Sequence, residues 1–93
     1  MMSDFFVETV SGEPVQSMLV SEQLANVISV WCSGVVVEEI DPFDSNKRQP
    51  GINVPCKDEV KRASIGDYVI KREDKTFDVI KPNEFQHSYK LRE

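Results

Sequence analysis

Residues 63–89 read ASIGDYVIKREDKTFDVIKPNEFQHSY, and this stretch decides the fold. Gly66-Asp67 is a turn signal, because glycine tolerates positive φ and aspartate hydrogen-bonds to nearby backbone. Residues 68–70 and 76–80 are rich in aromatic and β-branched side chains and flank a polar break. This pattern predicts two strands joined as a hairpin.

A short helix is expected directly after this hairpin. Pro82 suits the first turn of a helix, because its missing N–H costs nothing there. One turn would let Phe85 fold back onto the sheet, and residues 89–91 could add a last strand. Alternation also predicts that Phe77 and Val79 share one face of their strand.

One longer helix is predicted between residues 21 and 34. Ser21 is a good N-cap, and Gly34 is the expected left-handed residue at the other end. The apolar stripe falls at i, i+3, i+4 and i+7 and consists of Leu24, Val27, Ile28 and Trp31. Trp31 is expected to pack in the core, with a ligand-stacking role as the alternative.

Several short strands complete the expected elements. Residues 4–10 and 15–20 pair as a hairpin, or residues 1–12 form a mobile or swapped arm. Residues 35–40 begin with three valines and are expected to lie centrally in the sheet. Residues 51–55 end in proline, which indicates an edge or an end.

A polar loop is expected over residues 41–50, where Phe43 would anchor it on the body or on a neighbouring subunit. A loop of that length in a small domain is often functional or an oligomer contact. A turn at 56–59 and a strand at 60–63 then lead into the Gly66-Asp67 turn.

The sum is a single α+β domain spanning residues 1–93. One amphipathic helix is expected to pack on a small, curved, mainly antiparallel sheet of five to seven short strands. Ninety-three residues suffice for one modest hydrophobic core. Such a small sheet has exposed edges that self-association could cover, so a homo-oligomer is expected.

The charge is unevenly placed along the chain. Residues 1–46 hold eight acids and no Lys or Arg, while residues 47–93 hold eleven Lys and Arg against eight acids, so the two halves carry −8 and +3. The acidic total of −5 argues against duplex-DNA binding, which depends on phosphate neutralisation. The split fits a local basic pocket, head-to-tail self-association or interleaved surface charge.

No catalytic constellation stands out. Cys32 and Cys56 are expected to be free thiols, and no spacing supports pairing either of them with His87 as a nucleophile and base. Asp41 and Asp44 could hold a divalent cation weakly, but such residues more often form turns. We therefore expect neither an enzyme, a metal site nor a cofactor. The apolar runs are too short for a membrane-spanning helix.

Ligand binding is not excluded in the way that catalysis is. Basic side chains suit phosphates, and aromatic side chains in the C-terminal half could stack on a base. The candidate ligand-binding residues are Arg62, Tyr68, Lys71, Arg72, Lys81 and Trp31. The alternative is a solvated charged face over an aromatic core.

The C-terminal motifs resemble a family of small phage proteins that carry a Pro-Gly-Asp-Tyr/Trp motif and a Lys-Pro-Asp-x-Phe-x-x-x-Tyr ending. The matching segments are residues 66–68 and 81–85 with Tyr89, and weaker similarity extends over residues 14–91. Ile65 replaces the proline of that motif, and Asn83 replaces its aspartate.

The resemblance implies a phage origin. A short phage protein without catalytic residues is expected to act stoichiometrically on the host, in the host cytoplasm. In the sharpest form it is a counter-defence protein that sequesters a nucleotide immune signal in a pocket at an oligomer interface. The alternative is a protein–protein interaction module, either a host-protein inhibitor or a minor virion or assembly component, with no small ligand.

Overall fold

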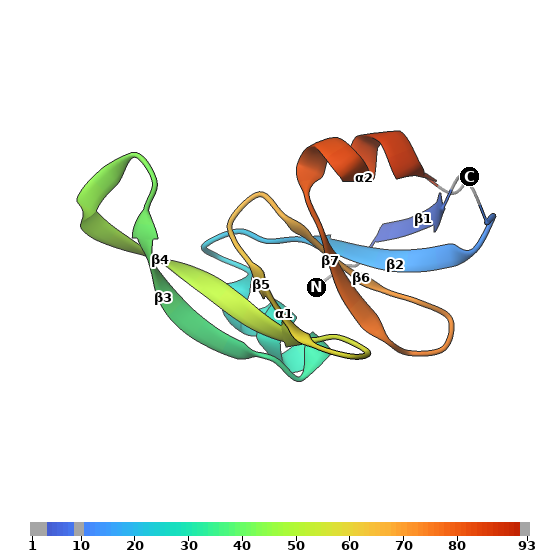
Figure 1. The fold of residues 1–93 in the computed structure, drawn as a ribbon, viewed down its shortest axis with the longest axis horizontal. Coiled ribbons are helices and arrows are strands. Elements are labelled where there is room, and N and C mark those ends of the chain that lie inside the picture. Colours follow the sequence, from blue (N-terminus) through green and yellow to red (C-terminus); the bar gives the residue numbers. More distant parts are fainter. Residues whose placement is uncertain (1–3, 9–10, 92–93) are drawn as a thin grey trace.

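A computed structural model describes the backbone of residues 4–8 and 11–91 and the side chains of residues 11–90. Within these residues the chain forms two helices and eight strands (Figure 1). They are β1 Asp4–Glu8, β2 Pro14–Leu19, α1 Ala25–Cys32, β3 Val35–Asp41, β4 Asp44–Pro55, β5 Val60–Ala63, β6 Tyr68–Lys71, β7 Phe77–Ile80, α2 Pro82–Ser88 and β8 Tyr89–Leu91. The predicted α+β class is confirmed.

The described strands form two antiparallel sheets, where the sequence predicted a single sheet. The larger sheet has the order β7-β6-β2-β1-β8, and the smaller has the order β3-β4-β5. Figure 1 shows α2 over one side of the larger sheet, with α1 and the smaller sheet on the other side. The division follows from α1, which carries the chain from β2 in one sheet to β3 in the other.

Two clusters of buried side chains hold these layers together. The first joins α1 to both sheets and includes Ile28 and Val69, while the second lies beneath α2 and includes Ile70. Phe77 and Val79 pack together against the first cluster, which confirms that they share a strand face. Because neighbouring residues of a strand point to opposite faces, the larger sheet contributes to both clusters.

The predicted C-terminal hairpin is confirmed. β6 pairs with β7 from Tyr68 opposite Ile80 onward. Gly66 has φ +97, which only glycine adopts without strain, so the predicted turn is also present. The Gly66 N–H donates to the Val20 carbonyl at 3.0 Å, and the Val20 N–H donates to the Asp67 carbonyl at 2.9 Å. These bonds fix the turn to the end of β2.

An aromatic stack fills the space beneath α2. Pro82 occupies the first turn of the helix, as expected. The Phe85 ring lies between the rings of Tyr68 and Tyr89, with centroid separations of 3.9 Å and 4.9 Å. Phe85 is buried, so its predicted return onto the sheet is confirmed.

The N-terminal and C-terminal strands lie side by side. β8 pairs with β1, and β1 pairs with β2 on its other side. The expected last strand is therefore present, as is the first hairpin. Residues 1–3 and 9–10 lie outside the described residues, and the alternative of a swapped arm stays a prediction.

The ends of α1 differ from the prediction. Ser21 does cap the turn that precedes the helix, since its Oγ accepts the Leu24 N–H at 3.2 Å. The left-handed residue is Ser33, with φ 57, and not Gly34. Gly34 is needed for close packing instead, because a Cβ there would lie 2.6 Å from the Asn53 carbonyl oxygen.

The buried face of α1 is rotated from the predicted stripe. Ile28 and Cys32 are fully buried, whereas Val27 is exposed. Trp31 is half-buried, and its ring meets the edge of the Phe77 ring at a centroid distance of 5.1 Å. The buried residues of the helix are Ala25, Ile28, Ser29 and Cys32, each one position later than the expected stripe.

The strand predicted over residues 35–40 is present as β3, but two other expectations for residues 35–50 were wrong. β3 is an edge strand and not a central one, and Val35 at its start is 61% exposed. The expected loop at 41–50 is mostly strand, because β4 starts at Asp44 and pairs with β3 along most of its length. The strand expected at 51–55 is the second half of β4, which is central, with proline at its end.

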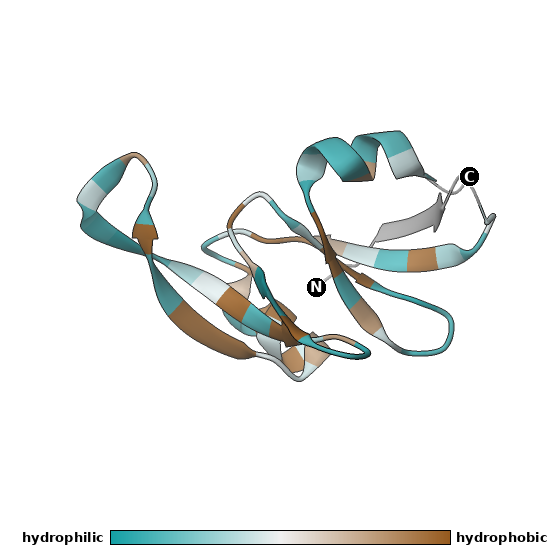
Figure 2. Ribbon diagram, in the orientation of Figure 1, coloured by the Kyte–Doolittle hydropathy of each residue, from teal (hydrophilic) through white to brown (hydrophobic). Residues whose placement is uncertain are grey.

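The outer part of this hairpin, residues 38–50, projects from the body and is called the arm (Figure 1). Figure 2 shows that β4 is hydrophilic along the arm. Water reaches both faces of such a projection, so its sequence carries no alternation of polar and apolar residues, which is why it read as a loop. Phe43 at the tip is 97% exposed and is not anchored on the body of its own chain.

Candidate functional site

Two of the six predicted ligand-binding residues, Lys71 and Arg72, line the same pocket. The pocket has a volume of about 230 Å³ and lies between the start of β2 and the turn that joins β6 to β7. We call it the cationic pocket, because its charged lining consists of three cations and one acid. It is lined by Pro14, Val15, Gln16, Lys71, Arg72, Glu73 and Lys75.

A tight turn positions the cations of this pocket. The Arg72 N–H donates to the Thr76 carbonyl at 2.8 Å, and the Lys75 N–H donates to the Arg72 carbonyl at 2.9 Å. Lys75 has φ 71, an uncommon conformation for a residue with a side chain. Asp74 stabilises the turn, since its carboxylate accepts the Thr76 N–H at 3.0 Å. The hairpin therefore presents Lys75 beside Lys71 at a fixed position.

Arg72 lies between two carboxylates. Its guanidinium approaches Glu13 at 3.6 Å and Asp78 at 3.5 Å. Both distances exceed the 2.7–2.9 Å or so of strong charge-assisted hydrogen bonds. Asp78 makes its short contact with Lys61, whose Nζ donates to Oδ1 at 2.8 Å. The row Glu13–Arg72–Asp78–Lys61 thus connects the residue before β2 to β5 across the C-terminal hairpin.

The pKa of the Asp78 carboxyl reflects its contacts with Lys61 and Arg72. Burial raises the pKa of its carboxyl, but the hydrogen bonds from Lys61 and the Val79 N–H and the charges of Lys61 and Arg72 outweigh burial, so the pKa lies below its ordinary value. The same hydrogen bond raises the pKa of Lys61. Both groups therefore remain charged across the neutral range.

A second pocket, of about 350 Å³, lies on the other side of Arg72. Its charged lining holds three cations and four acids, so it carries no excess of positive charge. It is lined by Cys56, Lys57, Asp58, Glu59, Lys61, Arg72, Asp74, Thr76, Phe77 and Asp78. We call it the mixed-charge pocket.

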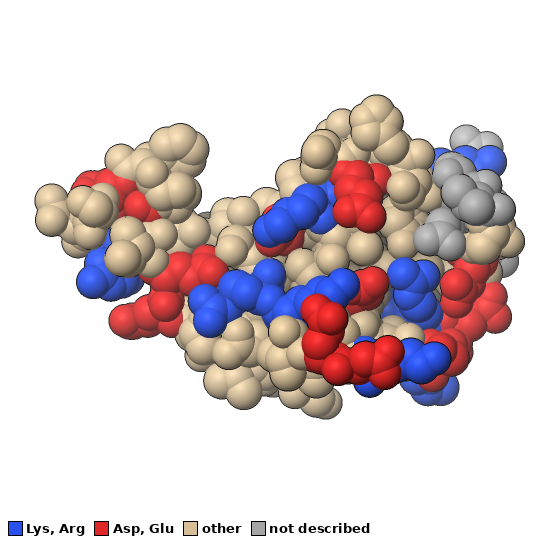
Figure 3. All heavy atoms as spheres, viewed as in Figure 1, with Lys and Arg blue, Asp and Glu red and all other residues tan. Residues whose placement is uncertain are grey.

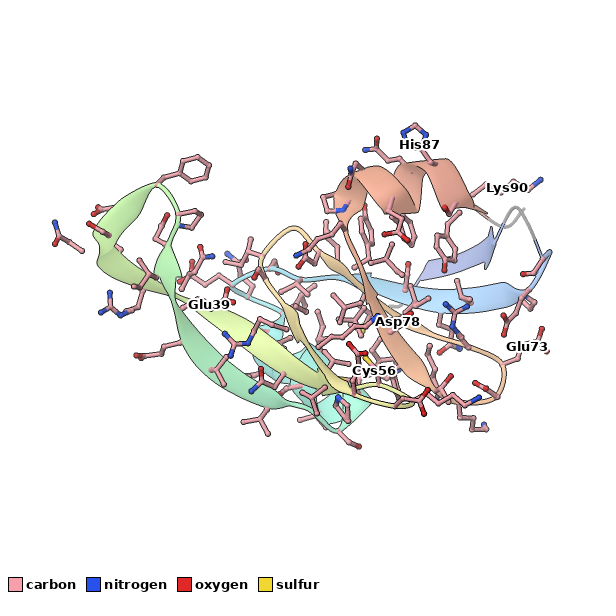
Figure 4. The ribbon with its side chains drawn as sticks, viewed as in Figure 1. Glu39, Cys56, Glu73, Asp78, His87 and Lys90 are labelled. Atoms are coloured by element: carbon pink, nitrogen blue, oxygen red, sulfur yellow. The ribbon has the colours of Figure 1, made fainter. Side chains whose placement is uncertain are left out.

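The structure does not bring the cysteines and the histidine together as a catalytic pair. Figure 4 shows Cys56 beside the hairpin near Asp78, while His87 points outward from α2. Burial, and then the charge of Asp78, raises the pKa of the Cys56 thiol. Burial likewise raises the pKa of Cys32. Both cysteines are free, as expected, and neither is activated as a thiolate.

The two aspartates at the arm tip accept hydrogen bonds from the backbone of the turn. Asp41 accepts the Phe43 N–H at 2.8 Å, and Asp44 accepts the Asn46 N–H at 3.0 Å. Within residues 11–90, no group of three or more His, Cys, Asp or Glu side chains is placed to hold a metal ion.

The other four candidate residues make structural contacts away from the cationic pocket. Lys81 pairs with the buried Asp67 at 2.9 Å. Tyr68 has one face covered by Phe85, and Trp31 packs on the core, as described above. Arg62 lies on the outer face of the smaller sheet, where its Nε donates to Asn53 at 2.6 Å.

A further polar network holds the base of the arm. The Glu39 carboxylate accepts hydrogen bonds from Ser64 at 3.0 Å and from Arg62 at 3.3 Å (Figure 4 labels Glu39). Gly51 makes room for this side chain, because a Cβ there would lie 2.6 Å from the Glu39 carboxyl carbon. Arg62 is therefore part of a structural network that ties β3 to β5.

Sequence reasoning missed two features of the surface. Lys75 was not singled out as a binding residue, although its place in a polar hairpin turn between Lys71 and the second strand was the available signal. The arm was missed because its second strand, over residues 44–49, is polar on both faces. Figure 3 shows basic and acidic side chains interleaved over the body in view, so the cationic pocket is a local feature.

Comparison of the chain with models of known protein families, with curated protein sequences and with solved structures gives no match. Fold and site therefore stand on this chain's own residues. Among the helices of the described residues, none has the length and apolar character needed to cross a membrane.

Proposed function

We propose that this chain is a small non-enzymatic phage protein that acts stoichiometrically on the host, in the host cytoplasm. In the sharpest form it is a counter-defence protein that binds and sequesters a nucleotide immune signal. The observation that carries the proposal is the cationic pocket, which gathers Lys71, Arg72 and Lys75 on a chain of net charge −5.

The chemistry of this pocket suits a phosphate group. Lys71 and Lys75 offer ammonium donors, and Arg72 offers a planar fork that matches phosphate oxygens. Arg72 is paired with Glu13 at 3.6 Å and with Asp78 at 3.5 Å, so a phosphate would have to compete with these carboxylates for its N–H groups, and the two lysines supply the main attraction. The acidic total charge disfavours long polyanions such as duplex DNA but not a single small anion.

The size of the pocket limits how much ligand it can enclose. About 230 Å³ is below the roughly 300–1,000 Å³ of pockets that enclose whole small molecules. The pocket therefore holds the phosphate part of a nucleotide, and among the side chains of residues 11–90 that line it, none is aromatic and able to stack on the base. We propose that the pocket lies at an interface between subunits, where a neighbouring copy encloses the rest.

Isothermal titration calorimetry tests this proposal with three probes: AMP, a cyclic dinucleotide and inorganic phosphate. The test variant is Lys71→Gln with Lys75→Gln, and the matched control is Lys47→Gln on the arm. Each lost charged hydrogen bond is worth about 1.5–3 kcal/mol, so we expect the double variant to bind a nucleotide on the order of a hundredfold more weakly. Equal affinity of the double variant and the control would refute the site, as would no binding of any probe.

The arm favours a second candidate function, a protein–protein interaction module without a small ligand. Its tip exposes Phe43 almost completely, and Ile40 nearby is 61% exposed. Exposed aromatic residues are typical anchors of protein interfaces. Under this alternative the protein inhibits a host protein or serves as a minor virion or assembly component. Phe43→Ser would then abolish capture of that partner, and calorimetry would detect no nucleotide binding.

A further inference from the structure

We propose that the arm tip of one copy, with Phe43 at its centre, docks into the cationic pocket of a second copy. The tip comprises residues 40–44, and its large exposed hydrophobic side chains are Ile40 and Phe43. This inference concerns self-association, and it does not depend on whether the pocket also takes a ligand.

The tip is held rigidly in a form that suits docking. Pro42 and Phe43 form a two-residue turn, and Asp41 accepts the Phe43 N–H at 2.8 Å. Asp44 accepts the Asn46 N–H at 3.0 Å on the other side of the turn. The Phe43 ring is therefore presented by ordered backbone, which lowers the entropy lost when the ring binds. Two carboxylates flank the ring, and residues 40–44 contain no basic side chain.

The cationic pocket complements this tip in charge and in size. Its lining holds Lys71, Arg72 and Lys75 against Glu73, and because Arg72 is already paired with Glu13 and Asp78, Lys71 and Lys75 are the cations that would meet Asp41 and Asp44. Pro14 and the aliphatic stems of the lysines provide apolar surface. A cavity of about 150 Å³ holds a benzene ring, so 230 Å³ accommodates the Phe43 ring. Ammonium groups beside an aromatic ring add cation–π attraction.

The arrangement of the molecule requires that the tip come from another copy. The longest extent of the described chain is 42 Å, and Figure 1 shows the arm at one end of this axis and the β6–β7 turn toward the other. One chain cannot bring its own tip to its own pocket. Two antiparallel copies would exchange tips reciprocally, which makes two identical contacts and closes the assembly as a two-fold dimer.

The tip and a nucleotide share one chemistry, since each presents an aromatic ring beside negative charge. In the proposed assembly the tip occupies the pocket of the ligand-free protein, which places the pocket at a subunit interface.

Sedimentation velocity over a range of protein concentrations tests the inference. We expect the natural chain to dimerise, and Phe43→Ser and the Lys71→Gln, Lys75→Gln double variant each to raise the dimer dissociation constant about tenfold or more. Raised salt should weaken the dimer, because the contact includes ion pairs. Val30→Ser is the matched control, since Val30 is 82% exposed on α1, away from the tip. This substitution should leave the dimer dissociation constant unchanged.

Mixing the two variants gives a sharper test. The Phe43→Ser chain keeps its pocket and the double-lysine chain keeps its tip, so a mixture should associate more tightly than either variant alone. A monomeric natural chain, an unchanged dimer after Phe43→Ser, or a mixture that associates no better than its components would each overturn the inference. Calorimetry of the Phe43→Ser variant with AMP separates this result from the proposed function, because that variant keeps the ligand pocket intact.

Discussion

Asp78 links three strands through a single carboxylate. It accepts a hydrogen bond from Lys61 on β5 and lies 3.5 Å from the Arg72 guanidinium that follows β6. Removal of this charge would leave two cations facing each other across the hairpin. Because Arg72 lines the cationic pocket, the same carboxylate also helps to position the proposed phosphate-binding group.

Asp78→Asn should make stability less sensitive to acid. The pKa of Asp78 is lowered in the folded chain, so its contribution is fully present above the unfolded value of about 3.9 and is lost as pH falls through the lower folded value. The variant should therefore be less stable than the natural chain at pH 7, with the difference shrinking below about pH 4. Melting temperatures measured from pH 2 to pH 7 check this. Asp58→Asn, at an exposed residue of the mixed-charge pocket, is the control. A difference in melting temperature between Asp78→Asn and the natural chain that does not change with pH would contradict this prediction.

Two neighbouring substitutions at the end of α1 should have opposite effects. Ser33→Gly should be neutral or stabilising, by up to about 1 kcal/mol, because Ser33 has φ 57. Gly34→Ala should destabilise by roughly 1–3 kcal/mol, because the added methyl would meet the Asn53 carbonyl oxygen at 2.6 Å. Urea denaturation measures both. The reverse order would mean that Gly34, as the sequence suggested, is the left-handed residue.

At the scale of elements, the hairpin β6–β7 and the helix α2 form a unit around the aromatic stack. Phe85 lies between two tyrosine rings at nearly parallel angles of 5° and 14°. Parallel rings this close exclude water from the second core cluster. α2 is only seven residues long, so packing through Phe85 and not helix propensity must hold it in place.

Phe85→Ala should cost roughly 3–5 kcal/mol, because it removes a buried ring from this stack. Urea denaturation followed by far-ultraviolet circular dichroism measures the loss. Gln86→Ala is the control, because Gln86 is the next residue of α2 and is exposed. A stability change below about 1 kcal/mol for Phe85→Ala would show that α2 does not depend on the stack.

The elements that the sequence predicted well are those with local signals. The Gly66-Asp67 turn, the alternation in residues 76–80 and Pro82 each carry their own chemistry, so the C-terminal hairpin and α2 followed from them. The second strand of the arm carried no such signal, because residues 44–49 are polar at every position. The separation into two sheets depends on long-range pairing that no local pattern encodes.

The basic candidate residues were chosen by their charge and their place near the C-terminal hairpin. Lys71 and Arg72 were selected in this way, and the structure places both of them on the cationic pocket. Lys81 and Arg62 were chosen on the same grounds, yet their partners Asp67 and Asn53 are fixed by tertiary contacts. Sequence gives the charge of a residue, but it does not show which cations are already paired in the fold.

At the scale of the whole molecule, groups of opposite charge lie at opposite ends of an elongated shape. The acidic tip and the cationic pocket lie toward opposite ends of a molecule 42 Å long. The uneven charge along the sequence therefore becomes a local pocket and a local tip on a surface of otherwise interleaved charge. Such a molecule can associate with itself and can hold a small anion, and both properties depend on Lys71 and Lys75.

Native mass spectrometry of the protein recovered from phage-infected cells tests the central claim most directly. We expect protein ions that carry an added mass of nucleotide size, and we expect the Lys71→Gln, Lys75→Gln variant, prepared in the same way, to lose that mass while Lys47→Gln retains it. Protein ions without any added mass in every oligomeric state, or an added mass that the double variant retains, would contradict the proposal that the cationic pocket sequesters a nucleotide.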